Sequence, residues 1–197
     1  MYKIITISRE FGSGGRTIGK KLAQKLGYEF YDSDIVAKVA ETSGYHPDFI
    51  KNHGESSTGG SVMFSYSRNG SITTGHNSMY DDIFLAQQKV ILDIAKEGNV
   101  VIVGRCADYI LREYESVFNV FIYSDIKARA KRIMEEYGEI EGKSIEKRLK
   151  DSDQKRRNYY KTYTGQEWGK TQNYDLTLNS SSFGIDKCVE IIYDLVK

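Results

Sequence analysis

The stretch that decides the fold lies at the start of the chain, where residues 2–17 read YKIITISREFGSGGRT. Residues 2–7 form a short β-branched apolar run, which predicts a buried strand. A glycine-rich turn follows at residues 11–15, and from Arg16 apolar residues recur every four positions until Gly27 ends the helical pattern. A strand, a glycine turn and a helix in this order predict an anion site, because backbone N–H groups and the positive helix end meet there.

The turn departs from the standard P-loop motif, G-x-x-x-x-G-K-[ST]. With Gly14 as the second motif glycine, Arg9 stands at the position of the first glycine and Gly15 at that of the lysine. Thr17 falls where kinases with a G-K-G-T ending place a magnesium-binding threonine. We expect Arg16 or Arg9 to supply the missing cation, since arginine binds phosphate bidentately.

Two other interpretations of the turn stay open at this point. The glycines can simply connect a strand to a helix. A dinucleotide-binding Rossmann fold is the second alternative, because residues 12–17 partly match G-x-G-x-x-G. That match lacks the last glycine. A Rossmann fold also has a strand that ends in an acidic residue about 20 residues later, and the sequence shows no clear strand of this kind.

The remaining chain alternates strands with helices, which predicts an α/β fold with a doubly wound parallel sheet. Residues 99–104 form the clearest strand, and their continuous apolar run suits a central position covered on both faces. Further strands are expected at residues 28–31, 117–123 and 174–179, and further helices at 35–44, 80–96, 126–137, 145–161 and 185–196. Residues 54–75 are rich in Gly, Ser, Thr and Asn and are expected to form a long flexible loop.

Length and composition limit the class of protein. The 197 residues suffice for one domain with a sizeable core, and a formal net charge of +1 argues against binding to nucleic acid or a membrane surface. The two cysteines and three histidines have no metal-binding spacing. No signal peptide or apolar spanning segment is evident, so we expect a cytoplasmic protein. The sequence carries no indication of oligomeric state.

Four stretches together resemble the cytidylate kinase-like family. They are ITISREFGSGGR at residues 5–16, VIVGRCAD at 101–108, YYKTYTG at 159–165 and YDLTLN at 174–179. The resemblance covers essentially the whole chain except residues 54–77. It implies a single P-loop kinase domain, residues 1–197, with a five-stranded parallel sheet and flanking helices. It also implies an acceptor-binding region at about 32–97 and a helical lid at about 126–165.

The resemblance also implies roles for individual residues. Asp32 and Ser33 match a pair at which cytidylate kinases bind the acceptor nucleotide, although both types also favour helix N-caps. Arg105, which follows the strongest strand, corresponds to an arginine on the acceptor phosphate. Cys106 replaces the family's aspartate at the next position, and Asp108 lies two residues later. We expect Cys106 to be a small buried residue.

Basic residues of the expected lid form the last candidate group. Arg129 and Arg132 lie three apart on one helix face and resemble the arginines of the family's lid helix. Arg157 matches the family pattern, whereas Arg156 stands in place of an aspartate and Tyr159 in place of an arginine. Neighbouring aromatic residues can stack a base or pack the helix onto the core, and we favour packing for Trp168.

The sequence therefore predicts a kinase that uses ATP and Mg²⁺ to phosphorylate a small nucleotide, with CMP or dCMP as the favoured acceptor. Phosphate binding is assigned to Gly12, Ser13, Gly14, Gly15, Arg16 and Thr17, with Thr17 as the metal ligand. Catalytic roles are assigned to Arg16, Arg129, Arg132 and Arg157, and acceptor binding to Asp32, Ser33, Arg105, Asp108 and Arg156. Two alternatives remain: a nucleotide-binding regulator with little turnover, and a P-loop kinase of another small acceptor.

Overall fold

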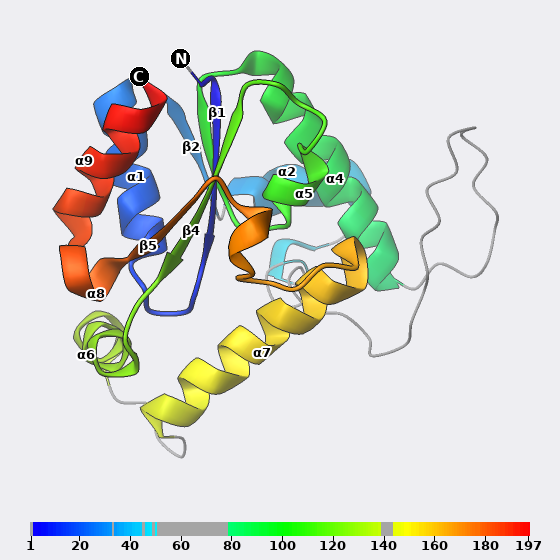
Figure 1. Ribbon diagram of the computed structural model, residues 1–197. Coiled ribbons are helices and arrows are strands. Elements are labelled where there is room, and N and C mark those ends of the chain that lie inside the picture. The colour runs from blue at the N-terminus through cyan, green and yellow to red at the C-terminus, as the bar shows by residue number, and fades with distance from the viewer. Residues whose placement is uncertain (1, 33, 45, 49, 51–78, 139–143) are drawn as a thin grey trace.

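A computed structural model describes residues 2–32, 34–44, 46–48, 50, 79–138 and 144–197. Its centre is a five-stranded parallel sheet with the strand order β2-β3-β1-β4-β5 (Figure 1). The strands are β1 (Ile4–Arg9), β2 (Glu29–Tyr31), β3 (Val100–Val103), β4 (Val117–Tyr123) and β5 (Leu176–Asn179). The expected five-stranded parallel sheet is therefore confirmed.

The strand order excludes the Rossmann alternative. In that fold the second strand lies beside the first, whereas here β3 is inserted between β2 and β1. The register pairs Ile5 with Val101 on one side and with Phe118 on the other. The glycine turn that follows β1 consequently lies at the middle of the sheet's carboxyl edge, where ligands collect in parallel sheets.

Helices cover both faces of the sheet and create two cores. On one side lie α1 (Gly15–Leu26) and α9 (Ile185–Val196), and on the other α2 (Asp34–Ser43), α4 (Met79–Glu97) and the short α5 (Ala107–Ile110) (Figure 1). The alternation of side chains along β1 sends Ile4 into one core and Ile5 into the other. All four residues of β3 are buried, as its apolar run predicts.

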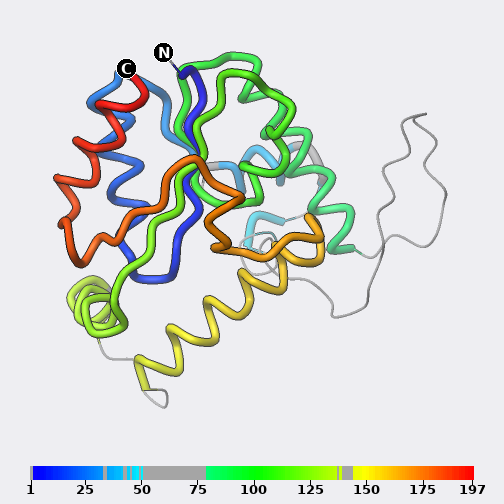
Figure 2. The backbone as a smooth tube through the Cα atoms, in the orientation of Figure 1, coloured from blue at the N-terminus to red at the C-terminus, as the bar shows by residue number. Residues whose placement is uncertain are grey.

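The carboxyl edge of the sheet is bordered by α6 (Ile126–Tyr137) and by the long α7 (Ile145–Thr164). Both termini lie at the opposite edge (Figure 2), where the amide of Tyr2 donates to the carbonyl oxygen of Val196 at 3.0 Å. None of the described helices has the length and apolar character that a membrane crossing requires. The loop expected at residues 54–75 lies outside the described residues.

Two boundaries differ from the sequence expectation in a way that matters for the site. The first strand was expected over residues 2–7 but continues to Arg9, because Arg9 pairs with Ile122 of β4. The last strand was expected from Tyr174 but begins at Leu176. One-turn helices such as α5 and α8 (Ser180–Phe183), and the 3-10 turn η1 (Thr171–Asn173), are too short to show a periodic pattern.

Candidate active site

The glycine turn has the backbone of a phosphate-binding loop. Gly14 adopts a left-handed conformation with φ 79°, and α1 begins at Gly15, so the first amides of the helix have no intrahelical acceptor and point out of its end. The loop is anchored from behind, because the Ser180 hydroxyl donates to the Ser13 carbonyl oxygen at 2.6 Å. Thr17 is exposed in the first turn of α1.

The two arginines expected to replace the P-loop lysine occupy different environments. Arg16 points outward, with 63% of its side chain exposed, and its Nε lies 2.6 Å from Asp32 Oδ2. Arg9 has only 14% of its side chain exposed, and its Nη2 lies 3.7 Å from Asp32 Oδ1. Asp32 therefore joins the two arginines, in addition to any role toward an acceptor. Ser33 lies outside the described residues.

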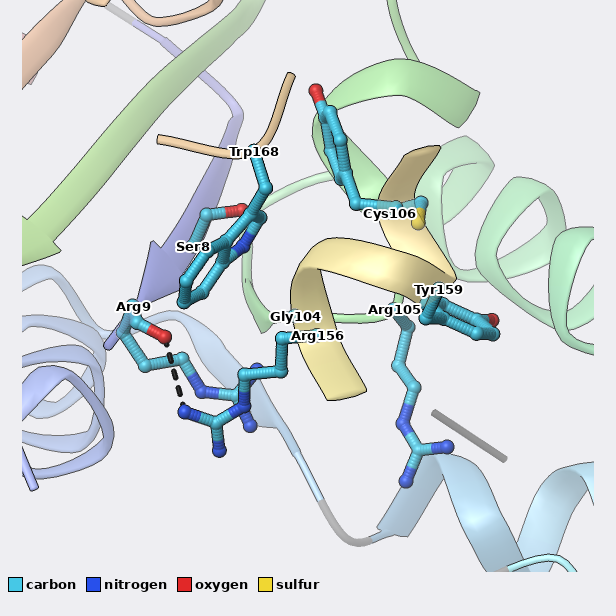
Figure 3. Close-up of a pocket in the computed structure, with 9 residues that line it drawn as sticks. Ser8, Arg9, Gly104, Arg105, Cys106, Arg156, Tyr159 and Trp168 are labelled. Carbon is cyan, nitrogen blue, oxygen red and sulfur yellow. Dashed lines mark hydrogen bonds between the residues drawn. The ribbon is translucent and has the colours of Figure 1, made fainter. Parts of the chain in front are cut away.

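A pocket opens where the carboxyl ends of β1 and β3 face α7 (Figure 3). Its described lining contains three arginines from distant parts of the chain, Arg9, Arg105 and Arg156, and no acidic residue. Figure 3 shows their side chains extending to the same side of the pocket. The other lining residues are Ser8, Gly104, Cys106, Tyr159, Tyr160 and Trp168. This concentration of guanidinium groups favours an anionic ligand.

The turn after β3 holds Arg105 in an unusual conformation. Gly104, Arg105 and Cys106 have φ values of 76°, 60° and 55°, in a region that side chains other than glycine rarely adopt. The Arg105 Nη1 donates to Oε1 of the fully buried Gln87 at 3.3 Å. A strained backbone and a buried partner together aim Arg105 into the pocket. Cys106 is buried, as expected.

Arg129 of α6 is surrounded by protein groups. Its side chain is 7% exposed; Nη1 lies 3.1 Å from Glu10 Oε2, Nη2 pairs with Asp153 of α7, and Nε donates to the Phe11 carbonyl oxygen at 2.7 Å. Asp153 Oδ1 also accepts from the Phe11 amide at 2.8 Å. Burial raises the pKa of Glu10 above its ordinary value. Arg129, a predicted catalytic residue, therefore links α6 to the glycine turn and to α7. We call this group of contacts the clamp.

Three other arginines of α6 and α7 contact the glycine turn, the end of β1 or an aromatic ring. Arg132 donates to the Gly12 carbonyl oxygen at 2.5 Å and lies against Gly14. Arg156 donates to the Arg9 carbonyl oxygen at 3.1 Å, so α7 contacts the last residue of β1. The Arg157 guanidinium lies 5.6 Å from the centre of the Trp168 ring.

The aromatic residues of α7 mainly pack this helix against the rest of the domain. Tyr159 and Tyr163 are buried, and the Tyr163 ring stacks on Phe84 of α4 with centroids 4.0 Å apart. Trp168 packs edge-on against Phe121 at 5.3 Å, in agreement with the expected packing role, and it also lines the pocket.

Asp108 lies beneath the pocket wall and, within the described chain, is not among the lining residues. It is 5% exposed and accepts a hydrogen bond at 2.7 Å from the hydroxyl of Tyr160, which does line the pocket. The structure therefore places the Asp108 carboxyl group behind Tyr160, and its predicted acceptor-binding role remains a prediction. Burial raises the pKa of Asp108 to about 6, against an ordinary value of 3.8.

This buried carboxyl predicts a pH-dependent stability. A carboxyl group whose folded-state pKa is raised stabilises the fold below its ordinary pKa and loses that contribution as the pH rises through about 6. Since one pKa unit corresponds to about 1.4 kcal/mol, ionised Asp108 is expected to cost on the order of 3 kcal/mol. An asparagine stays neutral and still accepts from Tyr160. Asp108→Asn should therefore be more stable than wild type above pH 6, measured by urea unfolding, with the difference shrinking toward pH 4. A difference that is constant with pH would contradict this origin.

Several site residues escaped the sequence analysis. Gln87 sits within an otherwise apolar helix pattern, and its contact with Arg105 spans 18 positions. Glu10 and Asp153 were assigned no role from the sequence, yet both bind Arg129. The sequence did signal that Arg9 and Gly15 are unusual, because an arginine occupies the first glycine position of the P-loop motif and a glycine occupies the lysine position.

The strand order and the glycine turn at the middle of the carboxyl edge are those of the P-loop kinase fold. A solved shikimate kinase from Bacteroides thetaiotaomicron superposes with a TM-score of 0.61 over 100% of this chain and 99% of its own, at 15% identity. An uncharacterized protein from Eubacterium ventriosum gives a TM-score of 0.72 at 26% identity, covering 98% and 97% of the two chains.

A profile of the cytidylate kinase-like family matches residues 4–182, so the chain belongs to this family. Relatives named cytidylate kinase extend over nearly the full length. The protein of Archaeoglobus fulgidus is 29% identical over 98% of this chain and 94% of its own, and that of Ignicoccus hospitalis is 26% identical over 96% of each. The chain is thus a nucleoside monophosphate kinase-like phosphotransferase, as the sequence resemblance predicted.

Proposed function

We propose that the protein transfers the γ-phosphoryl group of ATP to a nucleoside monophosphate, with CMP or dCMP as the favoured acceptor. The observation that carries this proposal is the convergence of Arg9, Arg105 and Arg156 on one pocket beside the glycine turn. An acceptor phosphate in this pocket lies next to donor phosphates held by the turn. The full-length relatives named cytidylate kinase support the choice of a cytidine nucleotide.

In the proposed reaction an oxygen of the acceptor phosphate attacks the γ-phosphorus of ATP. A new P–O bond forms, the bond to the β-phosphate oxygen breaks, and ADP leaves with that electron pair. The attacking oxygen is already anionic, so no general base is required. The protein therefore acts by positioning and by charge: Arg105 orients the acceptor, and Arg132 lies over the glycine turn where charge develops.

The residues present also fit Mg²⁺. The exposed Thr17 hydroxyl in the first turn of α1 is a suitable oxygen ligand, and in such sites substrate phosphates and water supply most other ligands. This agrees with the described chain, in which no group of three or more His, Cys, Asp or Glu residues is placed to hold a metal. Bound Mg²⁺ would neutralise charge on the phosphate oxygens.

A panel of acceptors tests the function. ADP release is measured with ATP and Mg²⁺ and with each common nucleoside monophosphate, in ribose and deoxyribose forms, together with shikimate and gluconate as sugar-like acceptors. We expect the largest stimulation by CMP or dCMP. Stimulation by a sugar-like acceptor alone would identify a different P-loop kinase. ATP binding without product from any acceptor would favour a nucleotide-binding regulator, for which the missing P-loop lysine is the main argument.

A further inference from the structure

The two departures from the P-loop motif, Arg9 and Gly15, lie directly against each other in the structure. A Cβ atom at Gly15, the lysine position, would lie 2.5 Å from Cβ and 3.0 Å from Cγ of Arg9. Real Cβ atoms essentially never approach so closely, and a Cβ next to the backbone of a paired strand cannot move aside. An arginine at position 9 and a lysine at position 15 therefore exclude each other, as long as the glycine turn keeps its backbone.

The exclusion concerns packing and not backbone conformation. Gly15 is helical, whereas Gly12 and Gly14 have φ values of 76° and 79°. In a helix, alanine is ordinarily preferred over glycine by about 1 kcal/mol. The need for glycine at position 15 therefore comes from the Arg9 stem. A standard P-loop has the opposite arrangement, with glycine at the first position and a side chain at the seventh.

The Arg9 side chain lies where a replacement cation is needed. It leaves the last position of β1, packs against the start of α1, and lines the pocket that also contains Arg105 and Arg156. Its side chain is 14% exposed, and its distance to Asp32 is 3.7 Å. Arg16, the other candidate, is directed outward and lies 2.6 Å from the same carboxylate.

We propose that Arg9 performs the work of the missing P-loop lysine, contacting the transferring phosphoryl group of ATP from the first motif position instead of the seventh. The proposal rests on the proposed function for the identity of the donor. Arginine donates to phosphate oxygens through a planar fork with two parallel N–H groups, whereas lysine donates from a single nitrogen. In this proposal the motif keeps a cation, which comes from its first position instead of its seventh.

Reciprocal substitutions test the proposal. Arg9→Gly should fold, bind ATP with Mg²⁺ more weakly, and lose on the order of 100-fold in turnover, as expected for loss of one group that stabilises transition-state charge. Gly15→Lys alone should lower the melting temperature because of the clash with Arg9. The double variant Arg9→Gly/Gly15→Lys restores the first glycine and the lysine of the motif and keeps Arg16 and Thr17. It should recover at least about tenfold in ATP affinity and turnover over Arg9→Gly.

The matched control is Arg9→Gly/Gly15→Ala, which relieves the same clash without restoring a charge. It should melt like the lysine double variant but remain as inactive as Arg9→Gly. Equal ATP affinity and turnover of the two double variants would overturn the proposal, as would wild-type behaviour of Arg9→Gly. If the double variants do not fold, Arg9→Met and Arg9→Lys decide: a selective loss of ATP affinity in the methionine variant supports the proposal, and equal affinities overturn it.

Calorimetric binding of ATP, ADP and AMP separates this proposal from the proposed function. A wild type that binds ATP but phosphorylates no nucleotide would end the nucleoside monophosphate kinase assignment. The Arg9 proposal would then be decided by affinity alone, with Arg9→Gly expected to weaken ATP more than AMP. A wild type that binds no ATP would overturn both.

Discussion

Arg105→Gly should lower kcat/KM for the acceptor nucleotide by on the order of 100-fold while changing the free energy of unfolding by less than about 2 kcal/mol, because relief of backbone strain offsets the lost hydrogen bond to Gln87. The two effects are separable because Arg105 has a φ of 60°. Glycine adopts this conformation without strain, whereas a side chain there costs of order 1 kcal/mol. The substitution thus removes the guanidinium and relieves the backbone together. The presence of an arginine at this strained position is consistent with a functional role for its side chain.

The measurement combines acceptor kinetics with thermal unfolding. Arg112→Ala is the matched control, because Arg112 is exposed outside the pocket and donates to the Tyr109 carbonyl oxygen at 2.8 Å. Its kinetics should equal those of wild type. Arg105→Lys retains a charge but loses the bidentate geometry, so it should fall between wild type and the glycine variant. Unchanged acceptor kinetics in Arg105→Gly would remove this residue from the acceptor site.

The sequence predicted the sheet well because its patterns are local. The apolar run of β3 and the glycine turn after β1 each indicate their structure within a few residues. The predicted end of β1 was wrong, and the reason is also physical. Ser8 and Arg9 are polar and look like the start of a loop, yet Arg9 pairs with Ile122, and such a partner is invisible in a local pattern.

The candidate site could be predicted only in outline. Positive charge near the glycine turn is apparent from composition, but the partner of each arginine depends on tertiary contacts. Arg129 reaches Phe11 across 118 positions, and Arg156 reaches Arg9 across 147. Arg129 therefore resembled a lid arginine in sequence, while the structure surrounds it with Glu10, Asp153 and the turn. Its predicted catalytic role remains a prediction.

Arg129→Met should be the most destabilising of these substitutions, lowering the free energy of unfolding by about 3–5 kcal/mol. The guanidinium lies between Glu10 and Asp153, both little exposed, and it also binds the Phe11 carbonyl oxygen. Methionine fills similar space without charge, so the loss comes from two carboxylates left without their cation. ATP affinity should fall as well, because the contact that fixes the glycine turn is lost.

The pH dependence of this loss identifies its origin. Burial already raises the pKa of Glu10, and removing the neighbouring cation raises the pKa further. The Glu10 carboxyl group therefore destabilises the variant most when it is ionised, and the deficit relative to wild type should grow from pH 5 to pH 8. Lys131→Met on the same helix is the control, since Lys131 is 78% exposed and its pair with Glu135 contributes below about 1 kcal/mol. A deficit of Arg129→Met that is constant across this range would indicate lost packing instead of unpaired charge, and the clamp between the glycine turn and α7 would then not be electrostatic.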